Sequence, residues 1–336
     1  MEKKIKIGII GCGHIGKRHA AVIDNALGAE LAGFCDIEIS QAQELTQLYD
    51  AKQVFTDYHE LIKSDLDVIS ICTPHYLHKQ MTIDALNAGK DVVVEKPMAL
   101  STKDAEEMTA LAEKLNRKLY VIKQNRFNVP IRLAEEAITS NKLGKIFMVE
   151  CNVLWNRHQA YYDQSEWRGY KEKEGGALFT QASHFIDILV WWFGDVVSAN
   201  TKIATQNHSI EVEDAGMANV EFSSGVLGAI NWTTNVYNKN YEGSITIIAE
   251  HGTIKIGGAY LNKIEFWDVQ SFPLPENIAY VDLPNNYGKY QGSSSNHHRV
   301  FEEILKDLSG EKSSIVEGWE GTKSIRAIEN IYLGVR

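Results

Sequence analysis

A glycine-rich turn near the N-terminus constrains the fold more than any other feature of this chain. Residues 11–16 read GCGHIG, and an apolar segment typical of a buried strand, residues 4–10, precedes them. Residues 14–27 have the pattern of a helix, and a second strand over residues 30–35 ends at Asp36. Such a glycine run is weak evidence alone. Between a strand and a helix, with an acidic residue after the next strand, it predicts a dinucleotide-binding βαβ unit.

The glycines of this turn have separate roles. Gly11 permits the tight turn, Gly13 lets the backbone approach a pyrophosphate, and Gly16 allows the helix to pack closely on the strand. The start of the helix, at His14 and Ile15, offers free amides and a partial positive charge to phosphates. We therefore expect the turn and the first residues of the helix to bind the cofactor.

Asp36 lies twenty residues beyond Gly16, at the end of a predicted strand. A carboxylate in this place accepts hydrogen bonds from the adenosine ribose hydroxyls and repels a 2'-phosphate. NAD is therefore favoured over NADP. An aspartate at a strand end can also cap the following turn or helix, and the two roles are compatible.

Strands and helices alternate up to about residue 124. Further strands are predicted at residues 68–72, 91–94 and 118–122, and helices at residues 40–49, 77–88 and 101–116. This alternation predicts a doubly wound parallel sheet. The fold class is therefore α/β, with an N-terminal NAD-binding Rossmann domain over residues 1–124.

Beyond residue 124 the pattern changes to mostly strands, which predicts a C-terminal α+β domain over residues 125–336 with a large, mainly antiparallel sheet. The expected strands are residues 146–155, 216–222, 226–234, 244–250 and 253–256, with a hairpin turn at His251-Gly252. The expected helices are residues 130–141, 176–193, 297–308 and 318–333, and residues 284–295 are expected to form a loop.

Composition excludes several classes of function. The formal net charge is −10 and no basic block is present, so a nucleic-acid surface is not expected. The four cysteines are widely spaced without a CxxC pair, which indicates neither a disulfide framework nor a metal site and favours a cytoplasmic location. The longest apolar stretch, Phe185 to Phe193, falls well short of the roughly 18 residues of a membrane span. No interaction with a membrane is therefore expected.

A charged amine is predicted at the carboxyl edge of the parallel sheet. The strand VVV, residues 92–94, leads directly into Glu95-Lys96-Pro97. Open α/β sheets bind their ligands at this edge, so Lys96 is a candidate for hydrogen bonding a substrate hydroxyl beside the nicotinamide. A lysine after a buried strand can also be a plain surface residue, and the upstream glycine turn favours the functional interpretation.

The strand that is predicted before this one ends in Cys72, Thr73 and Pro74. These residues are expected to line the nicotinamide side of the site, with His75 and His78 nearby. For either histidine a structural or surface role is as well supported as a role in the site.

Residues 175–187, GGALFTQASHFID, carry the second chemical signal. If the segment is helical, Thr180 and His184 lie one turn apart on the same face. Histidine exchanges protons near neutral pH, as hydride transfer from an alcohol requires. A histidine in an apolar segment can also be a core residue.

Residues 155–170, WNRHQAYYDQSEWRGY, are crowded with aromatic and amide side chains. Aromatic rings can stack on sugar or uracil faces, and Arg157 and Arg168 can form paired hydrogen bonds to a carboxylate or phosphate. An aromatic subunit interface is the alternative interpretation of this segment.

In combination these motifs resemble the glucose-fructose oxidoreductase, inositol dehydrogenase and MocA (Gfo/Idh/MocA) family, over Ile5 to Tyr332. The resemblance implies a nucleotide-binding domain followed by a domain with an open sheet, and a homodimer or homotetramer built through that sheet. It also implies that Lys96 and His184 flank the substrate. Many relatives have an aspartate four residues before the histidine, whereas this chain has Thr180. Threonine is no base at neutral pH, so proton transfer would fall to Lys96 or His184.

The aromatic segment, with residues 124–128 and 181–184, is similar to the subgroup that oxidises UDP-N-acetylglucosaminuronate at its 3-hydroxyl for surface-polysaccharide synthesis. This likeness implies that the aromatic rings and arginines hold the uronate and NAD, with Trp167 and Arg168 closest to the cofactor. By the same likeness, the protein could keep NADH bound and reoxidise it with 2-oxoglutarate. The substrate-binding residues would be Arg157, Tyr161, Tyr162, Gln164, Thr180 and His297. The cofactor-binding residues would be Gly11, Gly13, His14, Ile15, Asp36, Cys72, Thr73, Pro74, His78, Glu95, Lys96, Trp167 and Arg168.

The resulting hypothesis is an NAD-dependent sugar 3-dehydrogenase in which Lys96 orients and helps to deprotonate the hydroxyl while His184 shares the proton. Three alternatives stay open. The chain could oxidise inositol or another free sugar or polyol, it could be a glycosidase that uses NAD transiently, or it could be a non-catalytic NAD-binding regulator.

Overall fold

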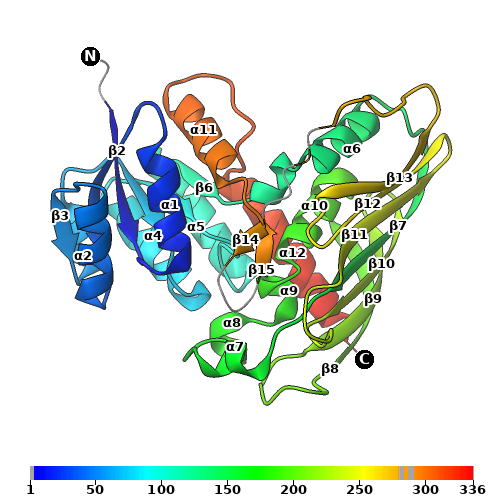
Figure 1. Cartoon of the computed structure of the whole chain (residues 1–336), viewed down its shortest axis with the longest axis horizontal. Coiled ribbons are helices and arrows are strands. Elements are labelled where there is room, and N and C mark those ends of the chain that lie inside the picture. The colour runs from blue at the N-terminus through cyan, green and yellow to red at the C-terminus, as the bar shows by residue number, and fades with distance from the viewer. Residues whose placement is uncertain (1–3, 279, 281–283, 287–290, 336) are drawn as a thin grey trace. The chain divides into compact units, whose positions relative to one another are not determined.

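The computed structural model describes residues 4–278, 280, 284–286 and 291–335 (Figure 1). The chain forms two compact units, of which the first comprises residues 1–123 and 297–322 and the second residues 124–296 and 323–336. The sequence had placed everything beyond residue 124 in the second domain. Residues 297–322 return to the first unit because the apolar face of their helix, α11 (His297–Leu308), packs on helix α1 (His14–Asp24).

The first unit is built on a six-stranded sheet in the order β3-β2-β1-β4-β5-β6, in which every neighbouring pair is parallel. Its central strands are short runs of apolar, mostly β-branched residues that are buried on both faces, as a doubly wound sheet requires. The strand order reverses between β1 and β4, which is where such sheets bind ligands. The strands are β1 Ile5–Ile10, β2 Ala29–Cys35, β3 Gln53–Phe55, β4 Val68–Ile71, β5 Asp91–Val94 and β6 Leu119–Val121.

Helices connect the strands of this sheet, and the predicted doubly wound fold is confirmed. Besides α1 and α11 they are α2 Ile39–Leu48, α3 Tyr58–Lys63, α4 His78–Asn87 and α5 Thr102–Lys114, with a 3-10 turn, η1, at His75–Leu77. The sequence analysis missed β3 and α3. Both are too short to show a period, and the start of α3 depends on a local cap, since Asp57 accepts a 2.9 Å hydrogen bond from the amide of His59.

The second unit is built on a seven-stranded sheet in the order β13-β12-β11-β7-β10-β9-β8. Strands β7 and β10 run parallel, and all other neighbours are antiparallel. The sequence analysis missed the two edge strands, β8 and β13, because their burial does not alternate regularly. The strands are β7 Ile146–Leu154, β8 Val196–Ala204, β9 Ala215–Phe222, β10 Leu227–Thr233, β11 Glu242–Ala249, β12 Gly252–Gly257 and β13 Lys263–Val269.

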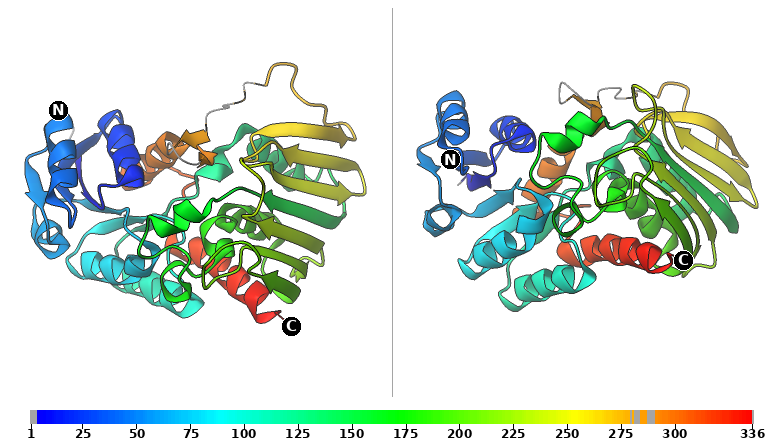
Figure 2. Two further views of the ribbon diagram at one scale, coloured as in Figure 1. Left: turned by 60° about the horizontal axis from the view of Figure 1, so that its bottom comes forward. Right: turned by 90° about the horizontal axis from the view of Figure 1, so that it is seen from below.

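Among the described elements, helices lie against one face of this sheet and leave its other face bare (Figures 1 and 2). The alternation in β9 shows the two environments, since Ala218 and Val220 are buried on the covered side whereas Met217 is 61% exposed. The helices are α6 Val129–Thr139, α7 Gln159–Asp163, α8 Lys171–Glu174, α9 Ala177–Thr180, α10 Ser183–Phe193 and α12 Gly318–Leu333, and a 3-10 turn, η2, spans Gln124–Phe127. None of the described helices is long and apolar enough to cross a membrane.

Three local predictions are corrected by the structure. The helix predicted at residues 176–193 is two helices, α9 and α10, because the chain turns at Gln181 and Ala182. The turn between β11 and β12 is Glu250-His251, since Gly252 already pairs with Ala249. Within the predicted loop at residues 284–295, β14 (Pro284–Asn286) and β15 (Gln291–Ser294) pair as antiparallel strands.

Candidate functional site

The glycine turn after β1 has the geometry of a phosphate-binding turn. Gly11 has a φ of +91°, and a Cβ on Gly16 would lie 1.9 Å from the Gly11 carbonyl oxygen, so the backbone itself requires both glycines. At Gly13 no described atom lies within 4 Å of where a Cβ would be. Protein packing therefore does not explain Gly13, whereas the close approach of a pyrophosphate does. The turn fits a bound dinucleotide.

Asp36 closes this turn from the end of β2. Its Oδ2 accepts a 2.7 Å hydrogen bond from the amide of Cys12, and its Oδ1 accepts a 2.9 Å bond from the amide of Glu38. The capping role is thus present in the structure. Each carboxylate oxygen has a second lone pair, so the ribose role that was predicted for Asp36 is compatible with these contacts. At the start of α1, His14 is exposed and Ile15 is half-buried.

The ends of β4 and β5 lie side by side, since Ile71 pairs with Val94 in parallel register. The residues that follow them, Cys72 to Pro74 and Glu95 to Pro97, therefore meet at the carboxyl edge of the sheet, as predicted. Thr73, Pro74 and Lys96 are half-buried, whereas Cys72 is 7% exposed. Burial raises the pKa of the Cys72 thiol well above its usual value, so this side chain is uncharged.

His78 ties these two strand ends together. Its ring is fully buried, with Nδ1 2.8 Å from the carbonyl oxygen of Pro97 and Nε2 2.8 Å from that of Thr73. Burial lowers the pKa of His78 in spite of the two carbonyl contacts, which raise it. His78 was predicted to bind the cofactor. Both ring nitrogens face carbonyl oxygens inside the protein, and a neutral ring donates to one of them, so we assign His78 to the packing of the two strand ends.

Glu95 is the centre of a buried cluster that the sequence did not reveal. The Nε2 atom of His19 lies 3.0 Å from Oε1 of Glu95, and Nε2 of His297 lies 3.5 Å from the same oxygen. Burial alone would raise the pKa of Glu95, but its interactions with the two histidines, led by the hydrogen bond from His19, outweigh this effect and hold that pKa well below its usual value. Glu95 is therefore a carboxylate at neutral pH. A ring nitrogen of each histidine and a carboxylate oxygen of Glu95 all lie within 4.8 Å of one another. The distance from His19 to Glu95 is that of a hydrogen bond.

His297 was predicted to line the outer substrate pocket. In the structure its side chain is 1% exposed and belongs to the first unit, where it faces Glu95. Burial lowers the pKa of His297 more than the neighbouring Glu95 raises it, so the ring is neutral at pH 7. The structure thus places His297 beside Glu95, and its role in binding a substrate stays a prediction.

In the second unit, His184 lies at the start of α10 and is 3% exposed. The side-chain amide nitrogen of Gln124, in η2, lies 3.1 Å from Nε2 of His184. This contact places the Gln124 amide where it can fix the orientation of the His184 ring. The sequence analysis did not single out Gln124 as a partner of His184.

A buried ion pair fastens η2 to α10 and so fixes Gln124 relative to His184. Arg126 donates two hydrogen bonds to Asp187, of 2.7 and 2.9 Å, and Ser324 donates a third, of 2.8 Å. The paired geometry compensates both charges where water is excluded. Asp187, three residues after His184 in the predicted segment, thus has a structural role.

The predicted substrate residues of the aromatic segment cluster around Tyr161. The guanidinium carbons of Arg157 and Arg168 lie 5.3 and 4.3 Å from the centre of its ring, and Arg168 lies 5.2 Å from the ring of Trp167. Gln181 donates a 3.4 Å hydrogen bond to the Tyr161 hydroxyl. Such cation–π contacts orient both arginines.

Tyr162 and Gln164, which were also predicted from this segment to bind the substrate, differ in their exposure. Tyr162 is 5% exposed and donates a 3.2 Å hydrogen bond to the hydroxyl of Thr234. Gln164 follows α7 and is exposed. The structure thus places Tyr162 in the support of the cluster around Tyr161.

Thr180 ends α9 and donates a 3.2 Å hydrogen bond to the carbonyl of Gly176. A carboxylate that the sequence analysis missed lies beside it, since Glu174 is 1% exposed and interacts with the Thr180 hydroxyl. Burial raises the pKa of Glu174 to about 6, although the Gly169 amide, Thr180 and Arg168 favour its charged form. The broken helix leaves Thr180 and His184 on separate helices, so the predicted one-turn spacing between them is wrong.

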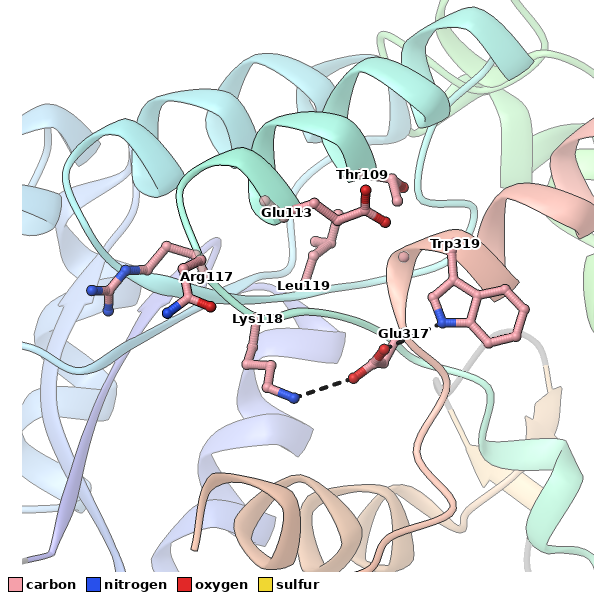
Figure 3. Close-up of a pocket in the computed structure, with 10 residues that line it drawn as sticks. Thr109, Glu113, Arg117, Lys118, Leu119, Glu317 and Trp319 are labelled. Carbon is pink, nitrogen blue, oxygen red and sulfur yellow. Dashed lines mark hydrogen bonds and ion pairs between the residues drawn. The ribbon is translucent and has the colours of Figure 1, made fainter. Parts of the chain in front are cut away.

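A separate pocket in the first unit lies where α5 meets the start of α12 (Figure 3). Lys118 binds Asp307 at 2.8 Å and Glu317 at 3.3 Å, and the indole nitrogen of Trp319 donates to Glu317 at 3.2 Å. Two charged groups of its walls, Lys118 and Glu317, are thus paired with each other. None of the predicted site residues lines this pocket.

Comparisons with known proteins agree with this geometry. The GFO/IDH/MocA model, described as an oxidoreductase family with an NAD-binding Rossmann fold, matches residues 5–123, and the model of the GFO/IDH/MocA C-terminal domain matches residues 131–255. D-Glucoside 3-dehydrogenase from Escherichia coli K12 is 30% identical over 242 residues, which are 66% of this chain and 68% of that protein.

Two solved structures of WlbA dehydrogenases, both in complex with NADH and UDP-GlcNAcA, resemble the chain over nearly its whole length. The enzyme from Bordetella pertussis is 34% identical with a TM-score of 0.89, covering 99% of this chain and 96% of that one. The enzyme from Chromobacterium violaceum is 35% identical with a TM-score of 0.91, covering 99% and 94%.

Proposed function

The chain belongs to the GFO/IDH/MocA family of NAD-dependent oxidoreductases, as a sugar dehydrogenase, and we propose that it oxidises the 3-hydroxyl of UDP-N-acetylglucosaminuronate to a ketone. The observation that carries the proposal is the likeness over 99% of the chain to two dehydrogenases that hold NADH and this sugar nucleotide. The chemistry of the residues in the second unit supports it.

The proposed substrate carries negative charge on its diphosphate and its uronate, whereas the chain has a net charge of −10. Binding therefore needs a local group of cations. Arg157 and Arg168 approach the same ring, that of Tyr161, and guanidinium groups recognise carboxylates and phosphates by paired hydrogen bonds. We assign anion binding to these two arginines and sugar stacking to the aromatic side chains around them.

Lys96 and His184 are the proposed catalytic residues. The glycine turn and Asp36 would hold NAD, which supplies the hydride acceptor when it is bound. Lys96 orients the 3-hydroxyl and takes part in removing its proton as the hydride leaves the same carbon, and His184 shares that proton. Much of the rate enhancement would come from holding the reacting carbon and hydroxyl in place.

The relative from E. coli, a D-glucoside 3-dehydrogenase, favours a second candidate, the oxidation of an uncharged sugar at the same position. Dependence on the nucleotide separates the two candidates. A free glucoside or inositol would place no negative charge at Arg157 and Arg168.

We also propose a homodimer or homotetramer that covers the bare face of the second sheet. Met217, Leu227 and Phe266 are 61%, 57% and 50% exposed on its strands, and exposed apolar groups on one open sheet face favour association with another copy. A place in surface-polysaccharide synthesis in the cytoplasm, with NADH retained and recycled by 2-oxoglutarate, belongs to the same proposal.

The first experiment is a spectroscopic assay of the purified protein with NAD and UDP-N-acetylglucosaminuronate, following NADH by its absorbance near roughly 340 nm. We expect coupled NADH and 3-oxo sugar, and almost no turnover in Lys96→Met. Lys103→Met, at an exposed position of α5, is the matched control and should keep full activity. Equal turnover of inositol and the sugar nucleotide would instead support the second candidate.

A further inference from the structure

The peptide that carries Lys96 is held by the side chain of the residue before it. The backbone amide of Lys96 donates a 3.0 Å hydrogen bond to Oε2 of Glu95, while the amide of Glu95 donates to the carbonyl of Ile71 at 3.1 Å. Of these two hydrogen bonds, the one from the Lys96 amide depends on a side chain, that of Glu95, whereas the other joins two backbone groups. The Glu95 carboxylate is therefore one of the groups that hold the Lys96 amide in place.

The other oxygen of that carboxylate is held from inside the first unit by His19. The ring of His19, in α1, is fully buried, and its Nε2 lies 3.0 Å from Oε1 of Glu95. Its Nδ1 lies 2.8 Å from the hydroxyl of Ser70, which is also fully buried. Because the Glu95 carboxylate can only accept, the N–H at Nε2 of His19 is the donor in this contact.

Helix α11 closes the cluster from a distant part of the sequence. His297 faces the same carboxylate oxygen at 3.5 Å, and the ring of Phe301 packs edge-on against His19 with 5.1 Å between ring centres. An anionic carboxylate that is 6% exposed needs a donor such as His19, because an unpaired buried charge is strongly unfavourable. The hydrogen bond from His19 and the nearby ring of His297 therefore restrict the rotation of the Glu95 carboxylate.

We propose that His19 is a positioning residue for catalysis: it holds the Glu95 carboxylate, which fixes the peptide from which the Lys96 side chain projects. This inference rests on the proposed role of Lys96 in hydride transfer. Catalytic geometry tolerates only small displacements, so a shift of this peptide is expected to reduce the chemical step. His19 itself is fully buried and is not expected to contact sugar or cofactor.

Two substitutions of His19 separate positioning from a general structural role. His19→Gln keeps a donor near the place of Nε2 and can still bind Glu95. His19→Asn keeps a polar group near the place of Nδ1, facing Ser70, but is too short to reach Glu95. Ile23→Val, on the buried face of the same helix, is the control for a modest loss of packing without any change at Glu95.

In steady-state kinetics, His19→Asn should lower kcat about ten- to a hundredfold, with KM for NAD and for the sugar nucleotide changed by less than about twofold. His19→Gln should recover most of kcat, and Ile23→Val should keep it. Wild-type kcat in His19→Asn, or equal losses in the asparagine and glutamine variants, would overturn the inference.

Hydrogen exchange resolved to single amides tests the same link without any substrate. In His19→Asn the Lys96 amide should exchange about tenfold faster than in the wild type, which corresponds to the loss of one hydrogen bond. The Glu95 amide, which is bonded to Ile71, should keep its rate. An unchanged rate at Lys96 would reject the positioning role whether or not a substrate is turned over.

Failure of the inference and failure of the proposed function are distinguishable. If Lys96→Met retains full turnover, the proposed role of Lys96 is wrong, and the exchange data still decide whether His19 holds the peptide. If Lys96→Met is inactive while His19→Asn is fully active, only the positioning role of His19 is wrong.

Discussion

Asp36 accepts a 2.7 Å hydrogen bond from the backbone amide of Cys12, so the acidic residue at the end of β2 braces the glycine turn that follows β1. The same carboxylate also accepts the amide of Glu38. One side chain thus combines a structural contact with the predicted recognition of the adenosine ribose.

Asp36→Asn should change cofactor preference. The amide keeps one acceptor for the Cys12 amide but removes the negative charge that repels a 2'-phosphate. We expect KM for NAD to rise and KM for NADP to fall, each by about tenfold, corresponding to about 1.4 kcal/mol. Glu38→Gln, at an exposed position, is the control. Unchanged preference in Asp36→Asn would argue that the carboxylate only caps the turn.

Gly13→Ala and Gly16→Ala should have opposite consequences. A methyl group at residue 13 meets no described protein atom, so the free energy of unfolding should be nearly unchanged while NAD affinity falls by about tenfold or more. A methyl group at residue 16 would clash with the Gly11 carbonyl and should cost about 3 kcal/mol of stability. Chemical denaturation and titration with NAD measure the two effects. Wild-type affinity in Gly13→Ala would contradict the assignment of this turn.

Asp187→Asn should destabilise the second unit, because it leaves the buried Arg126 without a compensating charge. The expected loss is about 3–5 kcal/mol in the free energy of unfolding. Asp195→Asn is the matched control, since Asp195 is 44% exposed and lies 3.8 Å from Arg326. Similar midpoints for the two variants in a urea titration would show that the Arg126–Asp187 pair contributes little.

The stability of the chain should depend on pH through Glu174. Its pKa is raised by burial from 4.5 to about 6, so the folded chain holds this proton more tightly than the unfolded chain. The stabilisation by that proton is fully present below pH 4.5 and is lost as the pH rises through about 6. The neutral side chain of Glu174→Gln should therefore make the variant more stable than the wild type at pH 8, by about 2 kcal/mol. The difference in the free energy of unfolding between Glu174→Gln and the wild type should shrink as the pH falls from about 6 to 4.5. Unfolding curves that show a constant difference across this range would contradict the raised pKa of Glu174.

The first unit could be predicted well from the sequence because local rules determine most of it. Short β-branched runs alternate with helices, and the glycine turn defines the first βαβ unit. The edge strands β8 and β13 were missed because their exposed faces blur the alternation on which strand prediction depends. The break between α9 and α10 was missed because neither of its two residues, Gln181 and Ala182, is a glycine or proline that would mark the end of a helix.

The supporting residues of the site could not be predicted, since each depends on contacts between distant segments. Nothing in the sequence shows that His19 and His297 meet at Glu95. Helix α1 carries His19 there, and the return of α11 to the first unit brings His297. Gln124 likewise meets His184 only because Arg126 binds Asp187. The glycine turn and the Glu95-Lys96-Pro97 run were recognisable because their chemistry lies in consecutive residues.

The most direct test of the proposed reaction uses UDP-N-acetylglucosaminuronate that carries deuterium at C3, incubated with the purified protein and NAD. If the 3-hydroxyl is the group that is oxidised, the hydride that leaves C3 carries the label, and mass spectrometry should find deuterium in the NADH that is formed. NADH without deuterium would mean that another position is oxidised. No NADH from this substrate, together with NADH from a free glucoside or inositol, would contradict the assignment of a sugar-nucleotide 3-dehydrogenase.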